Sequence, residues 1–186
     1  AGCATGCATA ASESMSPSSG PLTIRLPDAD AARAFGLALA TVLRAGDVLV
    51  LTGDLGAGKT TLTQGLGEGL GVRGPITSPT FVIARVPPSL VGGPALVHLD
   101  AYRLGGAVEL DDLDLDADLD ASVVVVEWGH GVAEQLSADR LEVVLQVVGP
   151  GETRQATVWA TGERWADPTA RAALAALASG APLADD

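Results

Sequence analysis

The order of apolar and polar residues predicts alternating strands and helices in the first half of the chain. Apolar residues that alternate with polar ones are typical of a half-buried strand, and apolar residues three or four apart are typical of a helix with one buried face. A short apolar run between turn residues is typical of a fully buried strand. These patterns predict a strand over 22–26, a helix over 30–44 capped by Asp28 or Asp30, a buried strand over 48–51 and a helix over 59–70.

The second half of the chain is richer in strand patterns. The runs that predict strands cover 80–86, 95–99, 122–127, 141–148 and 154–160. The last two runs alternate and are joined through Gly149 and Gly151, so we expect an antiparallel pair. An Ala/Leu-rich segment after Pro168 predicts a helix over 169–178. Together these elements predict one α/β domain over 21–179, with a mixed central sheet flanked by helices.

The two ends of the chain lack such patterns. Residues 1–20 are small, polar and aperiodic, so we expect a disordered tail, and the residues before Met15 are interpreted as a cloning or translation artefact. Residues 180–186 are expected to fray. The two cysteines lie in the first tail, which excludes a disulfide scaffold and a four-ligand zinc site. We find no secretory signal and no apolar run of membrane-spanning length, so we expect a cytoplasmic protein without membrane contact.

One motif combines glycines, a lysine and a threonine between a predicted strand and a predicted helix. Residues 53–60 read GDLGAGKT and match the phosphate-binding pattern G-x-x-x-x-G-K-[ST] at every position. Glycines let backbone N–H groups turn toward an oxyanion, and the helix N-terminus adds its dipole. The pattern predicts that Lys59 reaches the β- and γ-phosphates, that the Thr60 hydroxyl binds Mg²⁺ and that Thr61 touches the α-phosphate. The predicted nucleotide-binding residues of this P-loop are Asp54, Leu55, Gly56, Ala57, Gly58, Lys59, Thr60 and Thr61.

The composition adds two observations. Eleven Lys and Arg stand against 23 Asp and Glu, and the formal net charge of −12 opposes direct binding of nucleic acid, although a local basic site is compatible with it. Lys59 is the only lysine, and the other ten basic residues are arginines. Because an ammonium is a compact point charge and a guanidinium is broad and planar, this choice indicates that arginine would not serve at position 59.

Two acidic residues follow predicted buried strands, where a P-loop site needs a carboxylate for its hydrated Mg²⁺. Asp100 comes after the strand over 95–99, and Glu127 ends the strand over 122–127. We assign Asp100 to Mg²⁺ and Glu127 to the attacking water, although the residues alone also allow the opposite assignment. His98 can serve as a catalytic base or as a hydrogen-bonded structural residue.

Further motifs follow the P-loop in a fixed order. SPTF stands at 78–81, HLDAYRL at 98–104 and EW at 127–128. Together with GDLGAGKTT, this order resembles the bacterial TsaE (YjeE) family, the ATPase of tRNA threonylcarbamoyladenosine biosynthesis. The resemblance covers about residues 22–160.

The resemblance implies a P-loop ATPase that uses ATP and Mg²⁺ and is slow without its partners. It implies that hydrolysis drives a complex with the proteins TsaB and TsaD, through which contact with tRNA is indirect. It also implies a switch-like loop with Ser78 and Thr80 that senses the γ-phosphate, and a position for Trp128 beside the nucleotide. The family often has a threonine, thought to touch adenine, where this chain has Ala32, so the resemblance supports phosphate binding more strongly than base specificity.

Two other functions share the P-loop. A small-molecule or nucleotide kinase would need an acceptor pocket and a lid with several arginines, whereas the arginines after the P-loop are scattered. A non-hydrolysing adaptor would bind ATP through the same loop and turn it over negligibly. Measurement of turnover and of phosphate transfer to an acceptor separates the three functions.

Overall fold

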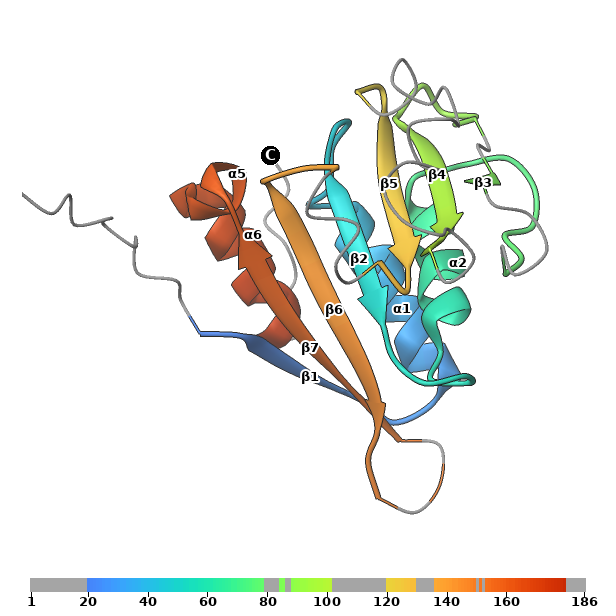
Figure 1. Ribbon diagram of the computed structural model, residues 1–186, viewed down its shortest axis with the longest axis vertical. Helices are drawn as coiled ribbons and strands as arrows, with labels where there is room; N and C mark the ends of the chain where they lie inside the picture. The colour runs from blue at the N-terminus through green and yellow to red at the C-terminus, as the bar shows by residue number, and fades with distance from the viewer. Residues whose placement is uncertain are drawn as a thin grey trace, which may run out of the picture.

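The computed structural model describes residues 20–78, 84–85, 88–101, 120–129, 136–149, 151 and 153–179. The strands are β1 (Leu22–Leu26), β2 (Val48–Thr52), β3 (Ala84–Arg85), β4 (Ala95–Asp100), β5 (Ser122–Glu127), β6 (Arg140–Val147) and β7 (Arg154–Thr161). The helices are α1 (Ala29–Ala40), α2 (Lys59–Gly69), α5 (Glu163–Ala166) and α6 (Pro168–Ser179). Within the described residues the strands form one seven-stranded sheet in the order β1-β7-β6-β2-β5-β4-β3 (Figure 1).

The sheet is mixed, as the sequence predicted. β2 pairs in parallel with β5 and β6, and β4 pairs in parallel with β5. The pairs β6–β7, β1–β7 and β3–β4 are antiparallel, which confirms the expected hairpin of the last two strands. The predicted α/β fold is therefore confirmed. Within the described ranges, no helix is both long and apolar enough to cross a membrane.

The two faces of the sheet belong to different core clusters because successive side chains of a strand point to opposite faces. In β2, Leu49 and Leu51 pack in a cluster with residues of α1, α2, α5 and α6. Val48 and Val50 pack in a second cluster with residues of β4 and β5. The described helices therefore share one face of the sheet.

Helices α1 and α2 approach each other closely at two glycines. A Cβ atom at Gly36 would overlap the carbonyl oxygen of Leu62, and one at Gly65 would overlap the carbonyl oxygen of Arg33. Only glycine leaves room for backbones to approach this closely. Because α2 begins at the end of the P-loop, this packing also fixes the position of the loop.

The structure differs most from the sequence predictions at two elements, α1 and α5. Asp28 caps α1 by accepting a hydrogen bond from the Ala31 N–H (2.8 Å), and α1 ends at Ala40 instead of 44. Its last turn tightens because Thr41 bonds to the Ala38 carbonyl through its hydroxyl (2.6 Å) and its N–H (3.1 Å). The four-residue helix α5 was not predicted, since so short a segment has no periodicity.

Part of the predictions falls outside the described residues. Of the strand expected over 80–86, only β3 is described. Residues 1–19 of the first predicted tail (1–20) and all of the second (180–186) lie outside the described ranges, and so does Thr80.

Candidate functional site

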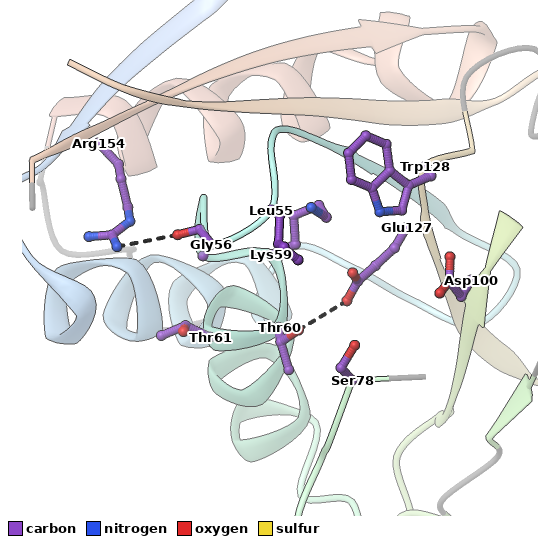
Figure 2. Close-up of a pocket in the computed structure, with 11 residues that line it drawn as sticks. Leu55, Gly56, Lys59, Thr60, Thr61, Ser78, Asp100, Glu127, Trp128 and Arg154 are labelled. Carbon is purple, nitrogen blue, oxygen red and sulfur yellow. Dashed lines mark hydrogen bonds between the residues drawn. The ribbon is translucent and has the colours of Figure 1, made fainter. Parts of the chain in front are cut away.

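The carboxyl ends of three parallel strands meet beside the P-loop (Figure 2). β2 runs directly into the loop, and its Leu51 pairs with Glu127 at the end of β5. In the next strand, Asp100 at the end of β4 pairs with Glu127 in register. Parallel pairing thus brings both predicted acids to the sheet edge from which the loop emerges.

The loop has the backbone geometry of an anion-binding turn. Gly53, Gly56 and Gly58 have φ angles of 152°, 80° and 104°, which residues with a side chain rarely adopt. Gly58 is the N-cap of α2 and makes no side-chain capping bond, whereas Asp28 caps α1 with its carboxylate. The N-terminus of α2 is therefore suited to an anion that satisfies its first N–H groups.

Lys59 points back into the loop. Its side chain is buried, and Nζ donates to the carbonyl oxygens of Gly53 (2.7 Å) and Asp54 (3.1 Å). The same atom lies 4.3 Å from the centroid of the Trp128 ring, a cation–π contact. Burial lowers the pKa of Lys59 below its ordinary value, and the carboxylates of Glu127, Asp100 and Asp54 oppose this shift. A bound phosphate would add a further opposing negative charge.

Trp128 has an unusual backbone. Its φ is 60°, the only positive φ of a non-glycine residue among the described residues. The Trp128 N–H donates to the carbonyl oxygen of Leu51 at 2.9 Å, which ties this conformation to the end of β2. Such outliers cost about 1–3 kcal/mol and concentrate at functional sites. The strained position holds the indole against Lys59.

Glu127 connects the P-loop threonine with the buried histidine. Its Oε1 accepts a hydrogen bond from the Thr60 hydroxyl at 3.3 Å and lies 3.0 Å from Nε2 of His98. An ionised carboxylate only accepts hydrogen bonds, so the fitting tautomer of His98 carries its proton on Nε2. His98 is 1% exposed, and its Nδ1 has no hydrogen-bond partner among the described residues. Of the two interpretations of His98, this geometry favours the structural one, in which it orients Glu127.

A cavity of about 540 Å³ opens at the loop. It is lined by Leu55, Gly56, Gly58, Lys59, Thr60, Thr61, Ser78, Asp100, Glu127, Trp128 and Arg154. The predicted loop residues Asp54 and Ala57 do not line it, although the Asp54 carbonyl holds Lys59. Ala32 is buried in the core cluster of α1 and does not line the cavity either.

Sequence reasoning missed Arg154. Its Nε donates to the carbonyl oxygen of Ala57 at 3.1 Å, and its Nη2 lies 3.4 Å from that of Gly56. No local motif marks this arginine, which stands 97 residues from Ala57. The alternation of the strand did carry a signal, since Arg154 shares a strand face with the buried Ala156 and Val158.

The residues at the cavity suit Mg²⁺ only together with a ligand. Among the described side chains, no group of three or more His, Cys, Asp or Glu could hold a metal ion. Mg²⁺ usually keeps several waters and binds through one or two carboxylates plus substrate phosphates. The Thr60 hydroxyl, Asp100 and Glu127 line the cavity beside the loop and fit that kind of coordination.

Comparisons with known proteins point in one direction. The sequence profile of the TsaE family, "Threonylcarbamoyl adenosine biosynthesis protein TsaE", matches residues 26–156. The tRNA threonylcarbamoyladenosine biosynthesis protein TsaE of Streptomyces coelicolor is 62% identical over 138 residues, which cover 72% of this chain and 93% of that protein. The protein of the same name from Mycobacterium bovis is 50% identical over 147 residues, covering 75% of this chain and 87% of its own length. The crystal structure of Bacillus subtilis YdiB matches with a TM-score of 0.67 and 33% identity, covering 86% of this chain and 95% of YdiB.

Proposed function

The chain belongs to the TsaE family, and we propose that it is a Mg²⁺-dependent ATPase that supports threonylcarbamoyladenosine modification of tRNA by driving a complex of TsaB- and TsaD-like proteins. The observation that carries the ATPase proposal is the geometry of one cavity, in which Lys59 and Thr60 of the P-loop face Glu127 at the end of β5. The names of its relatives in Streptomyces coelicolor and Mycobacterium bovis support the tRNA pathway.

Each residue then has a role that its position supports. The glycine turn and the N-terminus of α2 bind the phosphates, and Lys59 reaches the β- and γ-phosphates. Thr60 and Asp100 hold Mg²⁺, which when bound neutralises charge on the phosphate oxygens. Glu127 orients the attacking water, and its hydrogen bond to Thr60 keeps its carboxylate beside that metal ligand.

The net charge of −12 supports an indirect role in tRNA modification. A protein surface that binds the phosphate backbone on its own needs a positive patch. We therefore propose that partner proteins provide the contact with tRNA, and that this chain supplies ATP hydrolysis. This function belongs in the cytoplasm, where bacterial tRNA is modified.

The decisive experiment is the ATPase turnover of the protein alone, with TsaB and TsaD counterparts, and with those proteins and tRNA. We expect slow ATP hydrolysis by the isolated chain and faster hydrolysis with the partners. Lys59→Ala should lose the hydrolysis seen alone and the hydrolysis seen with the partners. Negligible turnover under all conditions would favour a nucleotide-gated adaptor. Transfer of the phosphoryl group to an added acceptor would favour a kinase instead.

The single lysine allows a direct test of nucleotide position. Lys59 and the N-terminal α-amine are the only primary amines, so an amine-reactive reagent labels two sites. Bound Mg-ATP should shield the Lys59 ammonium and hold it protonated, because a nearby anion favours the charged form. Peptide mass spectrometry should show that Mg-ATP protects Lys59 and leaves the N-terminus unchanged. Equal labelling of Lys59 with and without saturating Mg-ATP would contradict phosphate binding by the loop.

A further inference from the structure

The cavity contains a second cation that comes from the C-terminal half of the sheet. Among the described residues that line the cavity, Arg154 alone belongs to β7. β6 lies between β7 and β2 in the sheet, and Val147 at the end of β6 pairs with Arg154 at the start of β7. The hairpin therefore brings the first residue of β7 to the loop that follows β2.

Arg154 contacts the outer turn of the P-loop through two backbone carbonyls. Its Nε donates to the Ala57 oxygen at 3.1 Å, and its Nη2 contacts the Gly56 oxygen at 3.4 Å. A Cβ atom at Gly58 would lie 3.4 Å from the Arg154 side chain, so the arginine also packs along this turn. The turn therefore has a side chain against it that can fix its shape from outside.

The direction of these bonds matters for phosphate binding. The carbonyl oxygen and the amide hydrogen of a trans peptide point in opposite directions. A bond from Arg154 to the Ala57 oxygen therefore turns the Gly58 N–H away from the guanidinium. Gly56 and Gly58 have positive φ angles and no side chains of their own to hold them, so such a turn gains most from an external contact.

The charge of Arg154 also suits the cavity. Among the described residues that line it, Asp100 and Glu127 carry carboxylates, and Lys59 and Arg154 carry positive charge. Figure 2 shows Arg154 and Trp128 on opposite sides of the residues that line the cavity, with Gly56 and Thr61 on the side of Arg154. A nucleotide held by Lys59 at its β- and γ-phosphates would have its α-phosphate on the Arg154 side, because Thr61 is the predicted α-phosphate contact.

We propose that Arg154 is a positioning residue of the nucleotide site: it holds the turn 56–58 in the shape that binds phosphate and adds positive charge at the α-phosphate end. This inference rests on the proposed nucleotide binding. It predicts that loss of the arginine weakens the binding of ADP and of ATP by the same factor, since both nucleotides have an α-phosphate. Loss of Lys59 should instead weaken the binding of ATP more than that of ADP.

The test measures dissociation constants of Mg-ADP and Mg-ATP by calorimetry for the wild type, Arg154→Ala, Arg154→Lys and Arg140→Ala. Arg140 is the matched control: it lies at the other end of the same hairpin, where its Nε pairs with Glu142 at 2.8 Å. We expect Arg154→Ala to raise the dissociation constants of both nucleotides about tenfold, which corresponds to about 1.4 kcal/mol of binding free energy. The dissociation constants of Arg154→Lys should lie between those of the wild type and Arg154→Ala, because lysine keeps the charge and loses the contact with two carbonyls. Arg140→Ala should bind like the wild type.

Hydrogen exchange gives a readout that a general loss of stability would not produce. Without nucleotide, peptides that contain residues 53–60 should exchange faster in Arg154→Ala, while peptides from β4 and β5 should be unchanged. If Arg154→Ala does not fold, Arg154→Lys is measured in its place, with weaker binding and faster loop exchange expected. If a folded Arg154 variant binds both nucleotides as tightly as Arg140→Ala does, the inference is overturned and the proposed function stays intact. A wild-type chain that binds neither nucleotide would refute the proposed function itself.

Discussion

Replacement of Lys59 by methionine should remove one contribution to the pH dependence of the free energy of unfolding, and the sign of that contribution follows from the structure. In the nucleotide-free chain, burial lowers the pKa of Lys59 below its ordinary value of 10.5. Between the lowered pKa and 10.5, the unfolded chain binds more protons at this residue than the folded chain does. The free energy of unfolding therefore rises with pH across this window. Below the window the lysine is charged in both states, and the full cost of burying the ammonium is present.

The size of the effect follows from the contacts of the ammonium. Two hydrogen bonds to backbone carbonyls and the Trp128 ring stabilise the charged form, at about 1.5–3 kcal/mol per charged hydrogen bond and about 0.5–2 kcal/mol for the ring. The lowered pKa means that desolvation outweighs these contacts together with the nearby carboxylates. One titrating group changes the free energy of unfolding by at most about 1.4 kcal/mol per pH unit within its window.

The assay is urea unfolding of the wild type and Lys59→Met at several pH values from 7 to 10. Subtraction of the two curves removes the titration of all other groups. The free energy of unfolding of the wild type, relative to the variant, should be lowest near pH 7 and should rise toward pH 10. Saturating Mg-ATP should abolish or reverse this trend in the wild type, because phosphates favour the charged lysine. A difference that is flat or falls with pH in the nucleotide-free proteins would refute the electrostatic reasoning.

Three further outcomes follow from the structure. Asp100→Asn should keep the fold and lower Mg²⁺-dependent hydrolysis about 10–100-fold, because an amide is a poorer partner for the hydrated ion; wild-type turnover would contradict the Mg²⁺ assignment. Gly36→Ala should lower the free energy of unfolding by about 1–3 kcal/mol or more, because its Cβ would overlap the Leu62 carbonyl oxygen; an unchanged urea midpoint would show that α1 and α2 can separate freely. The isolated chain, with a net charge of −12, should bind tRNA weakly at physiological salt in a filter-binding assay, and tight, salt-sensitive binding would show that its electrostatics are misjudged.

The sequence predicted the parts of the molecule that depend on neighbours in the chain. The strand patterns are local, and β2, β4 and β5 appear within one residue of the expected bounds. The P-loop is a contiguous motif between a strand and a helix. Asp100 and Glu127 could be placed together because both end buried strands, and parallel strands end at one edge of a sheet.

The features that the sequence did not predict depend on partners far away in the chain. Helix α5 has only four residues, and contacts of Arg164 hold it: Nε lies 3.3 Å from Asp47 Oδ1, and Nη2 donates to the Val42 carbonyl at 3.0 Å. The hydrogen bond between His98 and Glu127 spans 29 residues and requires the register of β4 against β5. Neither interaction leaves a periodic pattern in the sequence, so only the assembled sheet reveals it.

The position of Arg154 shows how a core can fix a residue of a site. Alternate residues of β7 share a face, and Ala156 and Val158 on that face are buried in the cluster that includes α1 and α2. Arg154 is the next residue on the same face, so it must lie on the side of the sheet where α2 and the P-loop begin. A shift of β7 by one residue would turn Gln155 toward the loop and would remove both apolar side chains from the core. The burial that stabilises the hairpin therefore also keeps the guanidinium against the Ala57 carbonyl, and the site gains this contact without a local motif of its own.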